Sequence, residues 1–216
     1  MFRFIEPRVI EIVRNVEDLS CVPNGTTEVF CLSKRLKSLK GLPLSVTKLD
    51  CQGNQITSFQ NLLPSVTWLD CSINKITSFK GLPSSITRLI CWCNLITSFA
   101  GIPAVKTLDC SNNGITSFKG LPDSITCLDC KNNPITSFQY IPSSLEEIYI
   151  DTDIIPREGW YYFPFSVKIL NEFSDLEIYH KRSLLRHSQE MWSDRKTILK
   201  WLPFESLRKI EILMFT

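Results

Sequence analysis

The sequence predicts an α/β fold, a solenoid whose concave face is a ladder of short parallel strands and whose convex side is extended or 3₁₀ chain. Two observations predict it. Six cysteines recur at intervals of 20, 20, 20, 19 and 20 residues. The sequence around each one repeats the pattern LPxS(I/V)TxLDCxxNxITSFxG. Repeats of this length are typical of solenoids. We expect an N-terminal cap over residues 1–21, about seven repeats over 22–155, and a C-terminal helical cap or small docking domain over 156–216.

The strand of each repeat is predicted by the alternation around its leucine and cysteine. In a strand, Leu49 and Cys51 point to one face, while Lys48, Asp50 and Gln52 point to the other. Stacked copies bury the first face against their neighbours, with strands about 4.8 Å apart. The columns expected in the core are the leucine column (Val29, Leu49, Leu69, Leu89, Leu108, Leu128, Ile148), the cysteine column (Cys31, Cys51, Cys71, Cys91, Cys110, Cys130, then Ile150), an isoleucine column (Ile56, Ile76, Ile96, Ile115, Ile135) and a phenylalanine column (Phe59, Phe79, Phe99, Phe118, Phe138).

Two further features of the repeat have structural interpretations. The Gly-Leu-Pro before the strand excludes a long helix on the convex side, because proline lacks an N–H donor and glycine loosens the backbone. An asparagine follows each strand, at Asn54, Asn74, Asn94, Asn113 and Asn133. An inward amide there can pair backbone groups that the turn leaves unsatisfied, so we interpret this column as structural rather than ligand-binding.

This pattern resembles the leucine-rich repeat family, specifically its short, 20-residue class found in bacterial effector proteins. Similar repeats occur in proteins of large DNA viruses and amoebae. The resemblance covers about residues 22–155, although the fifth copy lacks one residue between Pro103 and Val105. It implies a fold rather than an activity. Some such effectors carry a ubiquitin-ligase domain much larger than the 60-odd residues after these repeats, and others consist of repeats and helical caps that act as scaffolds; this chain resembles the second kind.

The caps are predicted to be helical. At the start, Val9, Ile12, Val13 and Val16 fall on one helical stripe, and Pro7 suits a first turn. After an aromatic cluster at 159–165, the capping box 174–177 opens a helix to about residue 192; two more helices follow, to about 202 and 214. From residue 180 onward eight basic residues face four acidic ones, which is either a solvated cap surface or a docking surface for an acidic partner or nucleic acid. Residues 202–207 also resemble the opening of an F-box helix.

The composition and the motifs of the chain argue against catalytic, metal-binding and membrane-spanning functions. The formal charge is +2, two histidines leave little for imidazole catalysis or zinc, and no nucleotide-binding or hydrolase motif occurs. The longest apolar run is about five residues and the first 20 residues hold no signal-peptide core, so we expect neither a membrane span nor export. The column cysteines are interchangeable with isoleucine and so fill packing positions, and we expect no disulfides between them. Cys127 and Cys130 would face opposite sides of a strand, so we expect no zinc site there. Free thiols favour a reducing, cytoplasmic compartment. We expect no enzyme activity, cofactor, metal or small-molecule substrate.

The candidate site is on the outward side of the strands. The position after each leucine is mostly aspartate, and we expect Asp50, Asp70, Asp109 and Asp129 to repel one another and stay solvated as an acidic rim. The third and fourth repeats interrupt this pattern with Trp68, Arg88, Ile90 and Trp92, which Ile73 and Leu95 would extend. Exposed apolar patches mark contact sites, and Trp and Arg are enriched in binding hot spots. The alternative is that the tryptophans merely cover the face, with Arg88 stacked on Trp68.

The function expected is therefore non-catalytic binding of a partner protein through the concave face. The partner would offer an apolar knob flanked by Lys or Arg, and would be a host protein if the chain acts in a pathogen or virus. A second hypothesis is an adaptor, in which the repeats choose a target and the C-terminal helices dock a larger assembly such as a ubiquitin ligase. A third is nucleic-acid binding through the basic residues between Lys181 and Lys209.

Overall fold

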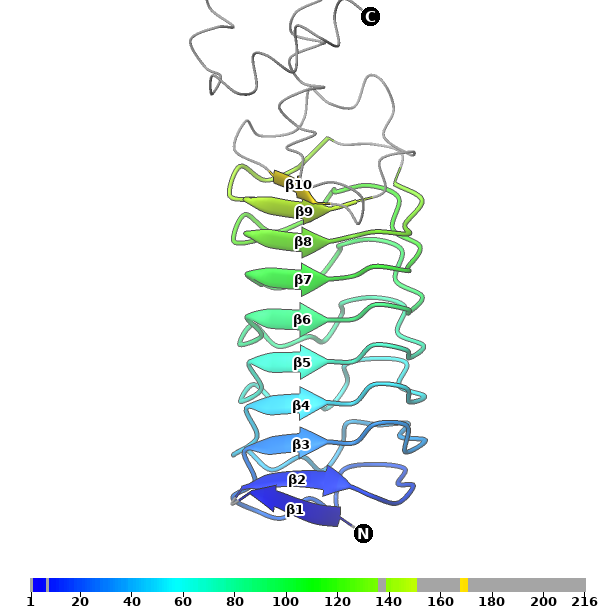
Figure 1. Cartoon of the computed structure of the whole chain (residues 1–216), viewed down its shortest axis with the longest axis vertical. Coiled ribbons are helices and arrows are strands. Elements are labelled where there is room, and N and C mark those ends of the chain that lie inside the picture. The colour runs from blue at the N-terminus through cyan, green and yellow to red at the C-terminus, as the bar shows by residue number, and fades with distance from the viewer. Residues whose placement is uncertain (1, 7, 136–138, 151–167, 171–216) are drawn as a thin grey trace, which may run out of the picture.

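The computed structural model describes residues 2–6, 8–135, 139–150 and 168–170, and these form one ten-stranded sheet in which spatial order follows chain order. Figure 1 shows the strands stacked from the N-terminal end upward, and from β2 to β8 each strand is joined to the next by a loop that returns behind the sheet. The strands are β1 (Phe2–Glu6), β2 (Val9–Ile12), β3 (Glu28–Phe30), β4 (Lys48–Asp50), β5 (Trp68–Asp70), β6 (Arg88–Ile90), β7 (Thr107–Asp109), β8 (Cys127–Asp129), β9 (Glu147–Tyr149) and β10 (Lys168–Leu170).

All neighbours from β2 to β10 pair in parallel, and the register confirms the rows read from the sequence. Trp68 pairs with Arg88, Leu69 with Leu89, and Asp70 with Ile90. The same three rows continue through every strand from β3 to β9. Because each repeat contributes its leucine at the same height, equivalent side chains of successive repeats lie side by side.

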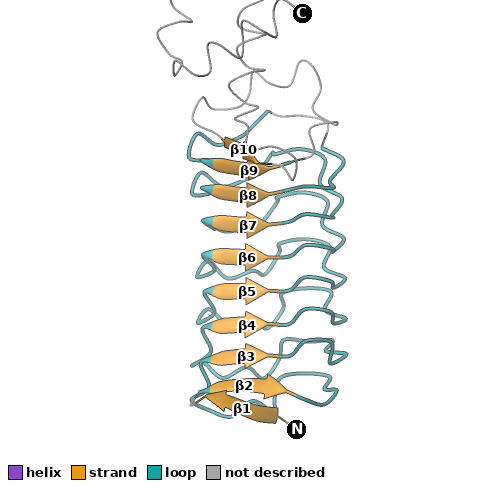
Figure 2. Ribbon diagram, in the orientation of Figure 1, coloured by secondary structure: helices purple, strands orange, loops and turns teal. Residues whose placement is uncertain are grey.

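The core consists of the columns expected from the sequence. The leucine and cysteine columns are at most 1% exposed, and the isoleucine column at most 2%. Behind them the phenylalanine rings stack: the centroids of Phe79 and Phe99 are 6.3 Å apart, those of Phe99 and Phe118 are 6.4 Å apart, and the rings are nearly parallel. Phe138 lies outside the described residues. Figure 2 shows loops, and no helix, on the side of the described repeats away from the strands, as the Gly-Leu-Pro signal predicts.

The short fifth copy keeps its strand in register by tightening one turn. In six other repeats the N–H of the residue three positions before the leucine-column residue donates to the carbonyl oxygen three residues back, as Ile86 N does to Pro83 O. In the short copy, Val105 N donates instead to Pro103 O, over 2.8 Å, only two residues back. The missing residue is therefore absorbed before β7, and Arg88 still pairs with Thr107.

The N-terminal segment corrects one prediction. Residues 2–12 form an antiparallel hairpin of β1 and β2 instead of a helix, and β2 continues the parallel ladder with Ile10 beside Val29. Ile10 and Ile12 are fully buried, whereas Val13, placed on the expected helical stripe, is 45% exposed. β-Branched residues favour strands, and the open edge of β3 offers unpaired backbone groups that only a strand can satisfy.

At the other end β10 pairs with β9, with Ile169 beside Ile148, so the ladder extends into the range assigned to the C-terminal cap. The helices expected between residues 174 and 214 lie outside the described residues.

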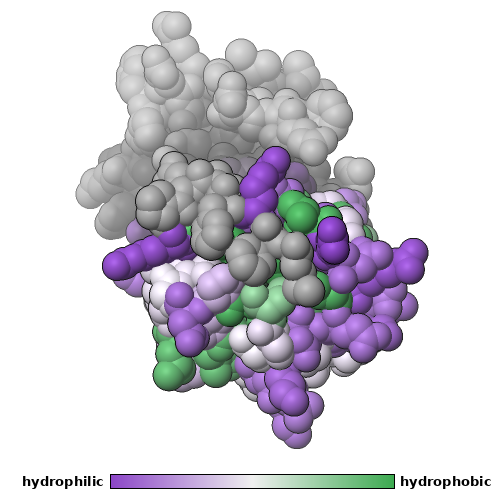
Figure 3. All heavy atoms as spheres, turned by 90° about the horizontal axis from the view of Figure 1, so that it is seen from below, coloured by the Kyte–Doolittle hydropathy of each residue, from purple (hydrophilic) through white to green (hydrophobic). Residues whose placement is uncertain are grey.

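In the part of the chain that is described, no helix is long and apolar enough to cross a membrane. Viewed from the β1 end, hydrophilic side chains project from several sides of the solenoid, and hydrophobic ones show at the lower left and near the middle of the view (Figure 3).

Candidate protein-binding surface on the strand face

We define the strand face as the outward side chains of β3–β9 together with the residue after each column cysteine. The structure brings together the four residues proposed as an anchor. Trp68 on β5 pairs directly with Arg88 on β6, and Ile90 and Trp92 follow Arg88 at two-residue steps on the same side. Arg88 is exposed, and the other three side chains are partly exposed. Apolar side chains that lie together and partly exposed on a folded surface are available for contact with another molecule.

Ile73 adjoins this apolar area, and Leu95 is a further exposed apolar side chain of the fourth repeat. Ile73 is 43% exposed and adjoins Trp92, because its N–H donates to the Trp92 carbonyl oxygen over 2.9 Å. Leu95, three residues beyond Trp92, is 58% exposed. We call Trp68, Ile73, Ile90 and Trp92 the tryptophan patch.

Backbone strain coincides with this patch. The residue two positions after each column cysteine adopts a left-handed conformation, with φ between 53° and 67° in six successive repeats, at Ser33, Gly53, Ile73, Cys93, Asn112 and Asn132. Glycine and asparagine tolerate this conformation, but a β-branched residue there is a genuine outlier. Ile73, at φ 53°, is the one β-branched residue in the column, and it is exposed beside Trp92. At this position Ile73 carries a backbone strain that glycine or asparagine would not.

The aspartates correct a second prediction, since Asp50 and Asp70 are 8% and 5% exposed rather than solvated. Asp70 Oδ1 accepts hydrogen bonds from Ser72 N (3.0 Å) and Ser72 Oγ (2.6 Å). Gln52 Nε2 donates to Asp70 Oδ2 (2.8 Å) and, more weakly, to Asp50 Oδ2 (3.4 Å). Burial raises the pKa of both carboxyl groups, with repulsion from Asp70 adding to the shift of Asp50 and repulsion from Asp109 to that of Asp70. Gln52, in the same repeat as Asp50, thus links Asp50 to Asp70 in the next repeat, and neither carboxylate is solvated as the sequence predicted.

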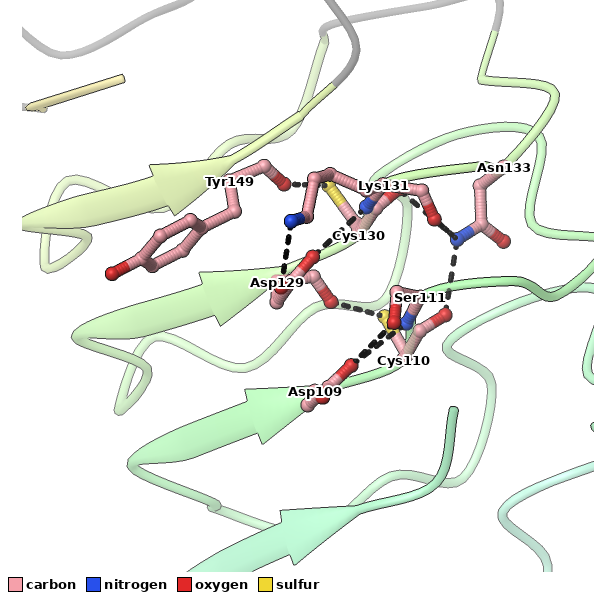
Figure 4. Close-up of polar contacts among 8 residues, drawn as sticks. All are labelled: Asp109, Cys110, Ser111, Asp129, Cys130, Lys131, Asn133 and Tyr149. Atoms are coloured by element: carbon pink, nitrogen blue, oxygen red, sulfur yellow. Dashed lines mark hydrogen bonds and ion pairs between the residues drawn. The ribbon is translucent and has the colours of Figure 1, made fainter. Parts of the chain in front are cut away.

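Asp109 and Asp129 are half-buried and repeat the same local arrangement (Figure 4). Asp109 Oδ1 accepts from Ser111 N and Ser111 Oγ, at 3.0 and 2.8 Å. Asp129 Oδ1 accepts from Lys131 N at 3.1 Å, and Lys131 Nζ lies 3.8 Å from Asp129 Oδ2. Each strand-face aspartate therefore caps the backbone two residues later, which holds the chain as it leaves the strand.

The cations of the strand face divide into two kinds. Lys48 Nζ lies 3.0 Å from Glu28 Oε2, 5.3 Å from the ring centroid of Phe30 and 5.2 Å from that of Trp68. Lys131 is held likewise by Asp129 and by Tyr149, whose ring centroid is 5.7 Å away. Among the described residues Arg88 has no ion pair, hydrogen bond or cation–π contact of its side chain. The cation over Trp68 is thus Lys48, not Arg88, which corrects the alternative in which Arg88 stacks on that ring.

The asparagine column is structural, as predicted. Asn54 shows the pattern: its Nδ2 donates to the carbonyl oxygens of Cys31 (2.7 Å) and Cys51 (2.9 Å), and its Oδ1 accepts from Leu36 N (2.9 Å). The amides of Asn74, Asn94, Asn113 and Asn133 bond the same way. Because these amides are already bonded to backbone groups, they have little capacity for a ligand.

The six column cysteines lie in the core. All nine cysteines lie within the described residues, where none forms a disulfide. Burial raises the pKa of Cys51, Cys71, Cys91 and Cys110 well above that of an ordinary thiol, so they stay protonated. Cys130 is buried while Cys127 is partly exposed on the strand face, which confirms that this CxxC splits across the strand. No group of three His, Cys, Asp or Glu in the described ranges is arranged to hold a metal ion.

Sequence reasoning missed three parts of this surface. The inward bonding of the aspartates has a signal, because Asp-Cys-Ser recurs at residues 70–72 and 109–111 and a serine two residues after an aspartate favours a side-chain turn. The strain at Ile73 has one too, since Asn, Gly or Ser fills the equivalent position in four of the five other repeats. The reach of Lys48 across Trp68 has none, since it depends on the rotamers of long side chains.

Comparison with known proteins identifies the fold. No protein-family model and no curated protein matches the chain. Among solved structures it is similar to YopM from Yersinia enterocolitica WA-314, with 24% identity and a TM-score of 0.59 over 73% of this chain and 35% of that one. It is also similar to the leucine-rich repeat domain of APL1B, with 18% identity and a TM-score of 0.59 over 76% of this chain and 53% of that one. It thus spans about a third and about half of these two chains, and in fold it is a leucine-rich-repeat solenoid with repeats of about 20 residues.

Proposed function

We propose that this chain is a non-catalytic protein-interaction module that binds a partner protein through its strand face, with Trp68, Arg88, Ile90 and Trp92 as the anchor. The observation that carries the proposal is the tryptophan patch beside Arg88. It lies on β5, β6 and the turns after them, between the polar outward residues of β4 and β7, and Trp and Arg are among the residues most often found in binding hot spots. A solenoid of this kind presents an extended surface suited to a protein chain.

The rest of the strand face supports binding without chemistry. Its aspartates are engaged with backbone and neighbouring side chains, its column cysteines are buried, and its asparagines are bonded to carbonyl oxygens. None of these groups is left available as a nucleophile or general base. The buried free thiols agree with a reducing compartment, and the resemblance of the repeats to those of effector proteins favours a host protein as the partner.

The test uses the full chain and a matched pair of variants. Ile90→Asp places on β6 the residue that the same row carries on β4, β5, β7 and β8, so the fold should accept it. Leu44→Asp makes the same chemical change at a side chain that is 76% exposed and off the strand face. Proteins captured from a host-cell lysate by the wild type and by Leu44→Asp, but lost with Ile90→Asp, would identify partners of this surface.

Trp92→Ala supplies a second, independent measurement. Removal of a hot-spot tryptophan should weaken binding of a captured partner by about 2 kcal/mol or more. The circular dichroism spectrum should stay unchanged, because Trp92 is partly exposed and lies outside the core columns. If Trp92→Ala and Ile90→Asp both bind like the wild type, the strand face is not the binding surface.

A further inference from the structure

Arg88 is the one charged strand-face side chain among the described residues that is exposed and also lies inside the apolar area. Lys48 and Lys131, the other cations of this face, each have a carboxylate within 4 Å and an aromatic ring within 6 Å. Arg88 has neither in the described structure, although it pairs in the ladder with Trp68 and precedes Ile90 by two residues. A guanidinium without a counter-ion beside apolar side chains is suited to receive a carboxylate from outside.

The neighbouring aspartates do not fill this role. Asp70 is directed to Ser72 and Gln52, and Asp109 to Ser111, at distances of 2.6–3.0 Å. Neither carboxylate comes within 4 Å of the Arg88 guanidinium, since the ion pairs found on this face involve Lys48 and Lys131 alone. The positive charge at the centre of the face is therefore available to a partner.

The surrounding charge limits the kind of anion. The strand face of β3–β9 carries six acidic side chains against three basic ones, with Glu28, Asp50, Asp70, Asp109, Asp129 and Glu147 opposing Lys48, Arg88 and Lys131. A dianionic phosphate would meet this field at a single arginine, whereas a monoanionic carboxylate can pair with the guanidinium at half the repulsion. The arrangement thus favours an acidic amino acid over a phosphorylated one.

The spacing of Arg88, Ile90 and Trp92 sets the spacing of side chains expected in the partner. Ile90 and Trp92 lie two and four residues after Arg88, which is roughly 7 and 13 Å along an extended chain. An extended partner segment has the same rise and the same two-residue alternation of side chains.

We propose that the strand face recognises an extended protein segment in which an Asp or Glu lies two or four residues from a large apolar side chain. The carboxylate pairs with Arg88, and the apolar side chain lies against Ile90 and Trp92. This proposal rests on the function proposed above and names the partner's chemistry. It reverses the expectation, drawn from the sequence, of a partner flanked by Lys or Arg, because the aspartates on which that expectation depended are already bonded.

The experiment is selection of a random 12-residue peptide library on the immobilised full chain, in parallel with Arg88→Glu, Arg88→Lys, Ile90→Asp and Leu44→Asp. The wild type and Leu44→Asp should enrich peptides with Asp or Glu two or four positions from Leu, Ile, Phe or Trp. Arg88→Glu should enrich Lys or Arg at that position, and Arg88→Lys should keep the acidic preference. For a synthetic peptide from the wild-type pool, replacing its acidic residue by Lys should weaken binding at least tenfold.

The outcomes separate the two proposals. If Ile90→Asp loses enrichment but Arg88→Glu leaves the charge preference unchanged, the strand face binds and the role of Arg88 is wrong. If Ile90→Asp selects the same peptides as the wild type, the strand-face function itself is wrong. If no variant enriches any peptide over the bare support, recognition of a linear segment is wrong. A phosphoserine peptide that outcompetes its glutamate counterpart would overturn the choice of a carboxylate.

Discussion

Asn94 donates a hydrogen bond from its side-chain Nδ2 to the carbonyl oxygen of Cys71, over 3.0 Å and 23 residues back along the chain. The same nitrogen reaches the carbonyl oxygen of Cys91 in its own repeat at 3.0 Å, while Oδ1 accepts from Ile76 N at 2.9 Å. One buried amide thus joins two successive repeats where the strand ladder ends. Its equivalents in other repeats do the same, so the turn after each strand depends on a single side chain.

Replacing Asn94 by Ala should destabilise the protein by about 2–4 kcal/mol, because two carbonyl oxygens and one N–H lose partners where water has little access. Urea unfolding followed by circular dichroism measures the change. Asn24 is exposed in a loop and serves as the control; Asn24→Ala should change stability by less than about 0.5 kcal/mol. Equal effects at the two positions would contradict the structural role of the column.

Ile73→Asn should make the protein more stable, by about 1 kcal/mol. Ile73 has φ 53°, a conformation that costs a β-branched residue more than it costs asparagine, which occupies the same place as Asn112. The reciprocal change, Asn112→Ile, should destabilise by a similar amount. Thermal unfolding of both variants measures the change in stability. If Ile73→Asn does not stabilise the protein and Asn112→Ile does not destabilise it, the conformation is not strained.

The same Ile73→Asn variant should bind library-selected peptides more weakly than the wild type, because it removes an exposed apolar side chain beside Trp92. Fluorescence anisotropy with a labelled peptide measures the affinity. A variant that is more stable and binds less well would indicate that stability is given up here for surface chemistry. Unchanged affinity would remove Ile73 from the tryptophan patch.

Asp50→Asn should stabilise the protein at pH 7 by about 0.5–1 kcal/mol, as expected when a like-charge pair across strands is removed. Burial, followed by repulsion from Asp70, raises the pKa of Asp50 above its ordinary 3.8 in the folded state. As the pH rises through 3.8 the unfolded chain ionises first, so stability falls until the folded carboxyl group also ionises. The advantage of Asn should therefore be present at pH 7 and absent below about pH 3.5.

Urea unfolding of the wild type and Asp50→Asn across this pH range measures the difference. Asp123→Asn, at an exposed loop position, is the control and should show little dependence on pH relative to the wild type. A variant that is less stable than the wild type at pH 7 would mean that the weak bonds from Gln52 outweigh the repulsion from Asp70.

The thiols should react in the order of their exposure. Iodoacetamide at pH 8 should modify Cys93, which is exposed, before Cys21 and Cys127, which are partly exposed. The column cysteines should react only on unfolding, since burial both blocks the reagent and keeps their pKa high. Mass spectrometry of the denatured, unreduced protein should then count nine alkylated cysteines, and protected pairs would indicate disulfides.

The repeat made most of the fold predictable. Once Leu49 and Cys51 are assigned to one face, the two-residue period of a strand places Trp68, Arg88, Ile90 and Trp92 on the other, and the register bears this out. The phenylalanine stack and the asparagine bonds follow from the same phasing. Periodicity averages over many copies, so single substitutions do not obscure it.

What the repeat does not cover was harder to predict. Val9, Ile12 and Val13 fit a helical period, whereas Ile10 and Ile12 fit the two-residue period of a strand, and the open edge of β3 decides between the two. The burial of Asp50 and Asp70 depends on Gln52 and Ser72, which vary from repeat to repeat and are not part of the conserved text of the motif. Such contacts arise between variable side chains, and the phasing of the backbone does not determine them.

The tightened turn at Pro103 and Val105 shows that the loops behind the sheet can lose a residue while Arg88 and Thr107 stay paired. Length changes and surface changes are therefore uncoupled in this molecule. Mutation of a loop need not alter the rows of outward side chains on the strand face. A new residue in one of these rows need not alter the spacing of its neighbours. Copies of the repeat can be duplicated, shortened or exchanged as units, so the surface proposed for binding can change by reordering strands that already fold.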